Sequence, residues 1–295
     1  MTIPTQQTYL ISLALSILYV AVIYIPIPQP ILAFCRISNS PVNQHDRNDP
    51  IVVQMRIVRI TGYTLLVCGI LPLILCYLDK EEQNQKRIHF LEIFQQLGFL
   101  PSPMKLILNS VNTLMILSLL YIAPLAHEIF VLQANPLKDY IQQITDTIHG
   151  LRDLIVGPLS EEIVYTAAMI ITLSHSEQRL SQDRLIYIPP LFFSVAHFHH
   201  AYNLHRQGHK ILPIVISTLA QGTYTYLFGI FTDYLFLRSS DVWCCFVAHS
   251  FCNFMGLPMF KASEGPSWWR SWGYYLGLVT GLIGFAYCLK FSLLI

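Results

Sequence analysis

The stretch GPLSEEIVYT, residues 157–166, places two adjacent carboxylates, Glu161 and Glu162, inside the apolar run from Leu151 to Leu173. That run reads as a membrane-crossing helix. A carboxylate at the bilayer centre costs roughly 2.5 to 3.5 kcal/mol on insertion scales, so such residues usually face a bundle interior or a water-filled cavity. One interpretation is structural: both glutamates are salt-bridged, or they lie near the interface because the helix starts at Pro158. The other interpretation is that the pair marks a functional site. The rest of the chain decides between these interpretations.

The composition indicates a polytopic membrane protein. Of the 295 residues, 54% are hydrophobic and 12% are charged, whereas about 25% charged residues is usual in a soluble domain. The net charge is +1, with Lys and Arg spread thinly along the chain. No nucleic-acid partner is therefore indicated, nor a polybasic membrane tether. The seven cysteines lie mostly in apolar runs without a CxxC pair, which favours free buried thiols over a disulfide framework.

Apolar runs and proline positions predict about eight membrane helices. A span of about 20 apolar residues crosses a hydrocarbon core of ~30 Å. The candidate segments are Tyr9 to Ile27, Ile57 to Tyr77, Leu106 to Leu125, Leu151 to Leu173, Leu191 to His200, Ile211 to Phe236, Val242 to Leu257 and Tyr274 to Leu294. Residues 90–97 and 137–151 repeat apolar side chains at helical spacing, which suits amphipathic helices at the membrane interface. We therefore expect an all-α fold.

Two further groups of polar residues occur in apolar helices. Phe193 stands four residues before His197 in PLFFSVAHFHH, and His249 stands four residues before Asn253 in HSFCN. Residues four apart share one face of a helix, so His249 and Asn253 can aim at one point while the Phe193 ring packs behind the His197 imidazole. A lone membrane histidine is often only a helix-to-helix hydrogen bond, but ionisable residues that face a cavity are functional sites by default.

Two glutamates, two histidines and an asparagine together match general-base hydrolysis. In that chemistry a carboxylate takes a proton from water, while imidazole and amide donors hold the developing oxyanion. Glu161 lies in the first turn after Pro158, where the helix N-terminus favours the ionised carboxylate and burial disfavours it. This opposition suits a base that works near neutral pH.

Metal chemistry is the main competing interpretation. The HExxH pattern of zinc peptidases is absent. Even so, Glu161, His197 and His249 could bind zinc, because two imidazoles and a carboxylate make a familiar ligand set. The histidines between His199 and His209 could suggest metal transport, but their spacing near a helix end fits a solvated interface at least as well. The sequence does not exclude a bound metal.

The three motifs, taken in order, resemble those of the type II CAAX prenyl proteases, the Ras-converting enzymes, within the CPBP family of intramembrane proteases. The family pattern is EExxxR, FxxxH and HxxxN on successive helices. This chain has EEIVYT at 161–166, FSVAH at 193–197 and HSFCN at 249–253. The longer strings PLFFSVAHFHH and HSFCNFMGLP resemble the eukaryotic members beyond the bare motifs. The resemblance covers roughly Leu97 to Pro258 and is specific because the motifs occur together.

The resemblance implies a multi-pass enzyme of the endoplasmic reticulum membrane, with about eight transmembrane helices around a polar intramembrane cavity open to the cytosol. Residues 1–104 would be N-terminal transmembrane helices with an interfacial loop, and residues 105–295 the catalytic CPBP-type core. The reaction would cleave after a farnesylated or geranylgeranylated cysteine and release the C-terminal tripeptide of CAAX proteins such as Ras-like small GTPases. No metal or other cofactor would be required. The substrate's prenyl chain would enter between helices from the membrane lipid.

The resemblance also implies roles for single residues. By position, Glu161 would be the general base on the attacking water and His197 its partner. His249 and Asn253 would form the oxyanion site. Three supporting positions would be Glu162, Phe193 and Thr166.

Thr166 departs from the family pattern, which has arginine there. An arginine four residues after Glu162 can pair with a carboxylate across one helical turn, and a threonine supplies no charge. Arg152 or Arg206 could replace it from elsewhere in the chain. The leading hypothesis is a prenyl-protein endopeptidase. The alternative, motivated by Thr166, is a catalytically weak or inactive membrane scaffold that binds prenylated partners.

Overall fold

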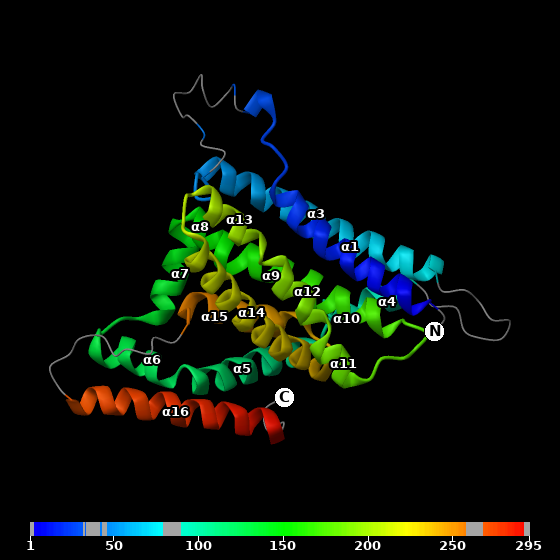
Figure 1. Cartoon of the computed structure of the whole chain (residues 1–295). Coiled ribbons are helices and arrows are strands. Elements are labelled where there is room, and N and C mark those ends of the chain that lie inside the picture. Colours follow the sequence, from blue (N-terminus) through cyan, green and yellow to red (C-terminus); the bar gives the residue numbers. More distant parts are fainter. Residues whose placement is uncertain are drawn as a thin grey trace. The chain divides into compact units, whose positions relative to one another are not determined.

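The computed structural model describes residues 3–31, 33, 42, 46–78, 90–257 and 268–291, with the backbone alone at 268–271 and 291. Apart from turns and loops, the secondary structure of this part of the chain is helical, with one isolated bridge between Ile3 and Ser176. The all-α prediction is thus confirmed for the residues described (Figure 1).

The structure contains α-helices and short π-helical turns, which are labelled η. In chain order they are α1 Thr5–Ile23, α3 Pro50–Leu78, α4 Phe90–Gln96, α5 Pro103–Leu120, α6 Ile122–Ala126, η1 His127–Val131, α7 Pro136–Asp146, α8 Ile148–Gly150, η2 Leu151–Val156, α9 Gly157–Glu161, η3 Glu162–Ala168, α10 Met169–Ser174, α11 Gln182–Tyr187, α12 Pro189–Ala196, α13 His199–Arg206, α14 Ile211–Ser239, α15 Val242–Met255 and α16 Trp268–Phe291.

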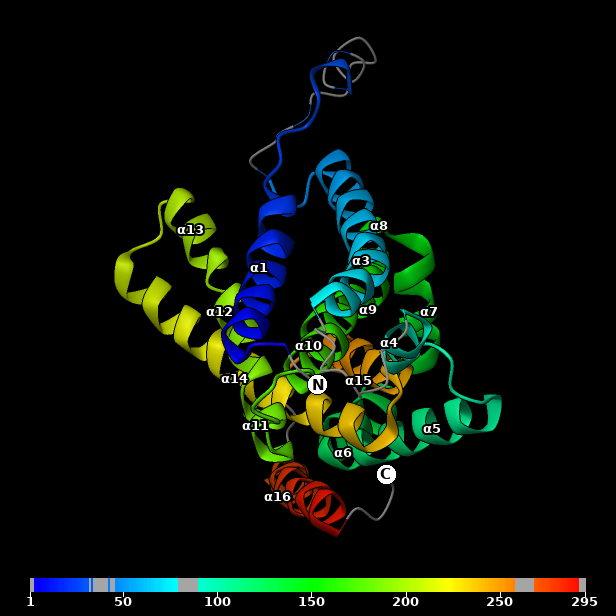
Figure 2. The ribbon, with the colours of Figure 1, turned by 90° about the vertical axis from the view of Figure 1, so that its right-hand side faces the viewer.

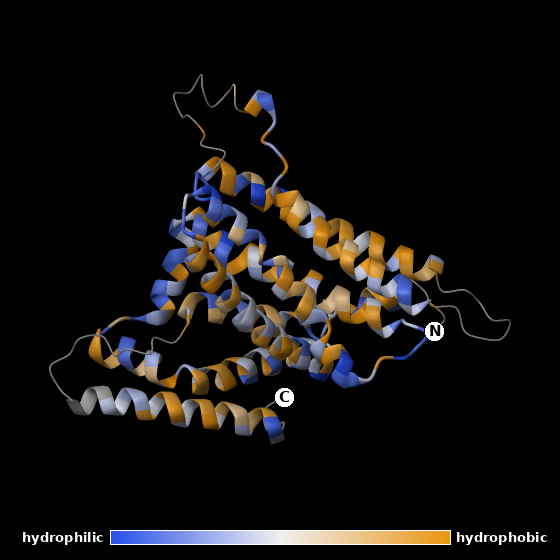
Figure 3. Ribbon diagram, viewed as in Figure 1, coloured by the Kyte–Doolittle hydropathy of each residue, from blue (hydrophilic) through white to orange (hydrophobic). Residues whose placement is uncertain are grey.

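Six helices among the described residues are long and apolar enough to cross a membrane, so the chain is a polytopic membrane protein. They are Thr5–Ile23, Pro50–Leu78, Pro103–Leu120, Ile148–Ser174, Ile211–Ser239 and Trp272–Lys290. Figure 3 shows hydrophobic residues along α1, α3 and α5. The two other predicted segments form shorter helices. A turn at His197 ends α12 after eight residues, and Gly256, with φ +66°, follows the 14 residues of α15.

Both predicted amphipathic segments contain helices. Residues 90–96 form α4, although residues 79–89 of the same polar segment lie outside the described part of the chain. The second segment is divided at Thr147, whose backbone is extended (φ −134°, ψ 136°). The Thr147 hydroxyl accepts a hydrogen bond from the Gly150 N–H at 2.8 Å, and thereby caps the next helix. The predicted helix 137–151 is therefore two helices, α7 and α8.

The chain forms two compact units, each made of two separate segments. The first unit contains residues 1–100 and 159–242, and the second contains residues 101–158 and 243–295. The predicted division at residue 104, between N-terminal transmembrane helices with an interfacial loop and a catalytic core, stays a prediction.

In the first unit, η3 packs against α1, α3, α12 and α14, so the turn that begins at Glu162 lies among four helices. Figures 1 and 2 show α1 and α3 side by side. Two glycines let α14 approach α12 closely. A Cβ at Gly229 would stand 2.8 Å from Pro190 Cβ, and the Gly222 carbonyl accepts a hydrogen bond from Ser194 Oγ at 2.8 Å.

In the second unit, α16 packs along α5 and α6. Glycines again permit the contact, because a Cβ at Gly277 would stand 3.0 Å from Ala123 Cβ. The start of the glutamate-bearing helix and α15 also belong to this unit. The Tyr121 hydroxyl donates to the carbonyl of Gly256 at 2.9 Å, and the Tyr121 and Phe251 rings meet edge to face at 5.5 Å. These contacts hold the end of α15.

Candidate active site

The helix that carries both glutamates, Ile148–Ser174, contains π-type turns on both sides of Pro158. Before the proline, the Gly157 N–H donates to the Arg152 carbonyl, five residues back. Proline has no N–H, so the carbonyls of Leu154 and Asp153, four and five residues before Pro158, receive no bond from that position. Single π-type turns inside α-helices occur frequently at functional sites.

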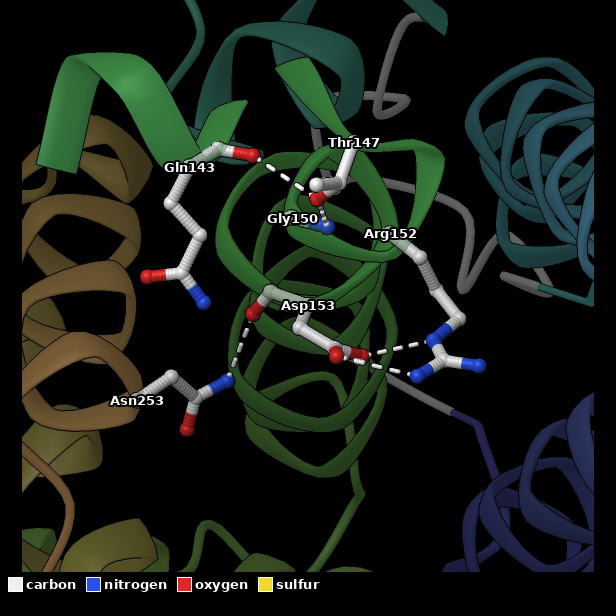
Figure 4. A network of polar contacts seen from close by, with 6 residues as sticks. All are labelled: Gln143, Thr147, Gly150, Arg152, Asp153 and Asn253. Atoms are coloured by element: carbon white, nitrogen blue, oxygen red, sulfur yellow. Dashed lines mark hydrogen bonds and ion pairs between the residues drawn. The ribbon is translucent and has the colours of Figure 1, made fainter. Parts of the chain in front are cut away.

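Side chains of α15 donate to both of these carbonyls. Asn253 Nδ2 donates to the Asp153 carbonyl at 2.9 Å (Figure 4), and Ser250 Oγ donates to the Leu154 carbonyl. Because the Ser250 proton is used in this way, Tyr140 donates its own hydroxyl proton to Ser250 Oγ, at 2.7 Å. The HxxxN motif is thereby held to the helix turn that Pro158 opens.

This arrangement predicts a stability loss for Ser250→Ala. The variant leaves the Leu154 carbonyl and the Tyr140 hydroxyl without the buried serine between them, which we expect to cost about 1–3 kcal/mol of unfolding free energy. Chemical unfolding of the purified protein in detergent measures the change. Thr280→Ala is the control, because Thr280 is exposed and its hydroxyl bonds to carbonyls of its own helix. Equal stability of the two variants would contradict the prediction.

The two glutamates differ in burial. Glu162 is 1% exposed, whereas Glu161 is partly exposed. Glu161 lies within electrostatic range of the hydroxyls of Tyr19, Tyr165 and Tyr224. The first glutamate of the motif is therefore the more accessible of the two.

Thr166 bonds directly to the second glutamate. Its hydroxyl donates to Glu162 Oε2 at 2.8 Å, and both side chains are buried. The two arginines considered as replacements have other partners. Arg152 forms a two-pronged ion pair with Asp153, at 2.6 and 2.9 Å (Figure 4), and Arg206 Cζ lies 5.8 Å from the centre of the Tyr202 ring. At the position of the family's arginine, a neutral hydroxyl thus bonds to the carboxylate.

The FxxxH motif fixes the imidazole of His197. The Phe193 ring meets it edge to face, with ring centres 4.8 Å apart, as the four-residue spacing predicts. His197 Nδ1 lies 2.9 Å from the Phe193 carbonyl. A carbonyl only accepts, so Nδ1 carries a proton and the lone pair of the neutral ring is on Nε2. The Tyr165 ring lies 5.0 Å from the Phe193 ring and connects η3 to α12.

The HxxxN motif places His249 and Asn253 on one helix of the second unit. His249 is 6% exposed, and Asn253 is exposed. The bond to the Asp153 carbonyl requires the nitrogen of the Asn253 amide to face that carbonyl. An amide nitrogen has two N–H donors, so this bond orients the group and uses one of them.

The predicted site residues thus fall into two sets, one in each unit, and the second unit holds His249 and Asn253 on α15. In the first unit, direct contacts pair Glu162 with Thr166 and Phe193 with His197. Sequence reasoning missed Asp233, which is 1% exposed in α14. The sequence contained the signal: Asp233 is a carboxylate inside the apolar run Ile211 to Phe236, just as the glutamates are carboxylates inside an apolar run. It also missed Ser250, although this serine stands inside HSFCN.

His199 and His200, which follow His197 closely, are neutral near physiological pH. Burial, with smaller contributions from the neighbouring imidazoles of His199 and His197, lowers the pKa of His200 to about 3. Burial likewise lowers the pKa of His199. Across the described residues, no three His, Cys, Asp or Glu side chains are grouped so that they could hold a metal ion.

The fold and these side chains define a class of protein: a polytopic membrane protein whose helices carry carboxylate, imidazole and amide groups suited to hydrolysis. Residues 143–255 match the family described as "Type II CAAX prenyl endopeptidase Rce1-like". The chain is similar to this family of proteases over these residues, and to relatives with the same activity in their names over 88% of its length.

Relatives over most of the chain carry matching names. CAAX prenyl protease 2 of Saccharomyces cerevisiae is 28% identical over 281 residues, covering 88% of this chain and 81% of the yeast protein. The probable CAAX prenyl protease 2 of Schizosaccharomyces pombe is 26% identical, covering 88% and 84%. CAAX prenyl protease 2 of Homo sapiens is 34% identical over a shorter region, 41% of this chain and 36% of the human protein. No solved structure shows a significant match.

Proposed function

We propose that this protein hydrolyses the amide bond after a farnesylated or geranylgeranylated cysteine and releases the C-terminal tripeptide of CAAX proteins, such as Ras-like small GTPases. The observation that carries the proposal is that all three motifs, from Glu161 to Asn253, lie inside the matching residues 143–255. The relatives named as CAAX prenyl proteases support the substrate class.

Glu161 is the general base in this proposal. Its partial exposure allows a water molecule to reach the carboxylate, and the burial of Glu162 disfavours that role for the second glutamate. Glu161 takes a proton from water as the oxygen attacks the scissile carbonyl carbon. The C–N bond then breaks, and the proton passes to the nitrogen of the departing tripeptide.

His197 is the partner of Glu161. Its Nδ1–H is held by the Phe193 carbonyl, which leaves Nε2 to accept a proton and to hand it on. His249 and Asn253 stabilise the oxyanion. The second N–H of the Asn253 amide suits this role, because a donor whose orientation is already set costs no reorganisation in the transition state. The motif order and spacing, together with the family match, support joint action of these groups.

The location and helix arrangement are part of the same proposal. We place the enzyme in the endoplasmic reticulum membrane, as the family resemblance implies. The shorter helices α12 and α15 would join the six candidate spans to make about eight helices around a polar cavity. Membrane lipid would deliver the prenyl chain, and no metal would take part.

Cleavage of a farnesylated CAAX peptide by the purified protein in lipid tests the proposal. We expect tripeptide release that survives a chelator, because a carboxylate can activate the water. The same peptide without the farnesyl group is the matched control and should be cleaved far more slowly. Release that stops with the chelator would contradict the metal-independent mechanism. Binding of the peptide without release, by protein shown to be folded, would contradict the proposed activity.

A further inference from the structure

The short helix α7 is attached to α15, the helix that carries the HxxxN motif. The Tyr140 hydroxyl bonds to Ser250 Oγ at 2.7 Å, and the Tyr140 and Phe254 rings meet edge to face with their centres 5.3 Å apart. Ser250 and Phe254 are the residues directly after the two motif residues of α15. One side chain of α7 therefore holds the segment that carries the proposed oxyanion donors.

The other end of α7 packs against the start of the glutamate-bearing helix. The Thr147 hydroxyl donates to the Gln143 carbonyl at 2.9 Å and accepts from the Gly150 N–H at 2.8 Å (Figure 4). The two backbones are so close that a Cβ at Gly150 would collide with the Gln143 carbonyl. All these contacts lie within one compact unit. Helix α7 thus joins α15 to the start of the glutamate-bearing helix.

A different side of α7 is apolar and exposed. Successive residues of a helix are about 100° apart around its axis, so Leu137 and Ile141 lie on one side, next to Tyr140 and Ile144 and opposite Asp139. Leu137 is 69% exposed and Ile141 is 52% exposed, whereas Tyr140 and Ile144 are partly buried. The apolar stripe of α7 is therefore wider than the part that the described protein covers.

The position of α7 between two candidate spans identifies the environment of this stripe. The span Pro103–Leu120 precedes α7, and the span Ile148–Ser174 follows it. Consecutive spans cross a membrane in opposite directions, so the segment that connects them lies at one membrane surface. With 11 residues, α7 is too short to cross the hydrocarbon core itself. A helix with one apolar and one polar side lies there in the plane of the interface, with its apolar side toward the acyl chains.

We propose that α7 is a membrane-anchored brace: Leu137 and Ile141 lie in the lipid interface, and Tyr140 is a positioning residue that holds the HxxxN helix. The lipid contact rests on topology and exposure alone. The positioning role rests on the proposed function. Because Ser250 also donates to a carbonyl of the glutamate-bearing helix, the Tyr140 bond keeps the two helices in register and the Asn253 amide oriented.

Photo-crosslinking in phosphatidylcholine vesicles tests the lipid contact without a substrate. Benzoylphenylalanine replaces Leu137 or Ile141 or, as the matched control on the opposite side of α7, Asp139. After irradiation, mass spectrometry of the peptides detects covalent lipid adducts. We expect adducts at Leu137 and Ile141 several-fold above the level at Asp139. Equal levels at all three positions, or crosslinks from Leu137 and Ile141 to a second copy of the chain instead of lipid, would overturn the lipid contact.

Kinetics with the farnesylated peptide in the same vesicles test the positioning role. Tyr140→Phe keeps the ring against Phe254 and removes the hydroxyl, so kcat should fall about 2- to 10-fold with KM unchanged, the scale of one neutral hydrogen bond. The double variant with Ser250→Ala should lose no more kcat than Ser250→Ala alone, because the same link is already broken. Tyr226→Phe is the matched control: it removes a hydroxyl that donates to a backbone carbonyl at 3.3 Å and should keep the parent's rate.

Polar substitutions connect the anchor to the rate. Leu137→Gln combined with Ile141→Gln should lower kcat several-fold in vesicles, whereas Leu137→Met combined with Ile141→Leu should keep the parent's rate. Unfolding midpoints establish that each variant is folded at the assay temperature.

The outcomes for the anchor and for the activity are distinct. An unchanged kcat in Tyr140→Phe, or additive losses in the double variant, would remove the positioning role. Equal rates for the polar and the conservative pair would remove the anchor from catalysis. Lipid adducts as expected in a parent that cleaves nothing would overturn the proposed function and leave the lipid contact standing.

Discussion

Glu161→Gln is expected to abolish tripeptide release, with kcat falling by about 10²–10⁴-fold, the range for loss of a general acid–base group. Glutamine has nearly the same shape as glutamate but cannot take a proton from water. The substitution also changes no side-chain volume to speak of at this partly exposed position, so we expect the variant to fold. Initial rates with a farnesylated peptide, at several concentrations in lipid, separate kcat from KM.

The control for this variant is Glu177→Gln, which makes the same chemical change at an exposed position. Its kcat should equal that of the parent. The unfolding midpoint of each variant should remain near that of the parent, since neither change creates a cavity. A Glu161→Gln enzyme that retains the parent's rate would remove this residue from the mechanism and point to another base.

Asn253→Ala is expected to lower kcat by about 10²–10³-fold, the measured scale for loss of one oxyanion donor. The change should leave KM within a few-fold, because the interaction strengthens only as charge develops on the oxygen. The same variant also removes the bond to the Asp153 carbonyl. A small loss of stability should accompany the large loss of rate.

Two comparisons separate these effects for Asn253. Ser250→Ala weakens the same attachment of α15 without removing an amide donor, so its rate should fall much less than that of Asn253→Ala. Asn203→Ala removes an asparagine whose amide donates to the Tyr24 hydroxyl, at 3.2 Å, and should keep the parent's rate. If Ser250→Ala and Asn253→Ala lost the same fraction of kcat, Asn253 would be acting through structure alone.

Local pattern predicted the helices because each one depends on its own stretch of chain. Apolar length sets the long spans, and the four-residue spacing places Phe193 against His197. The same pattern made residues 191–200 look like a continuous span. The observed helix is shorter, because the chain turns at His197 and the following histidine-rich and arginine-containing residues form a separate polar helix.

The π-type turns show where local reasoning stops. Because Pro158 has no N–H, the sequence alone indicates that the carbonyls of Leu154 and Asp153 receive no hydrogen bond from that position. The groups that donate to these carbonyls are the side chains of Asn253 and Ser250, about 100 residues away along the chain, and no local pattern identifies them as donors. The spacing of HSFCN predicted that His249 and Asn253 share a face, but not that Asn253 also bonds to the glutamate-bearing helix.

By itself, the sequence determined the membrane class, the family resemblance and the positions of the motif residues, because composition and short spacings are local properties. The tertiary structure alone decided that Glu162 is buried while Glu161 is partly exposed. It also decided that Thr166 bonds to Glu162 and to Thr232 of another helix. Burial and hydrogen bonding depend on which distant segments pack together. Thr166 on η3 and Thr232 on α14, for example, are 66 residues apart. Helical periodicity relates only residues that are close in sequence, so it does not predict this contact.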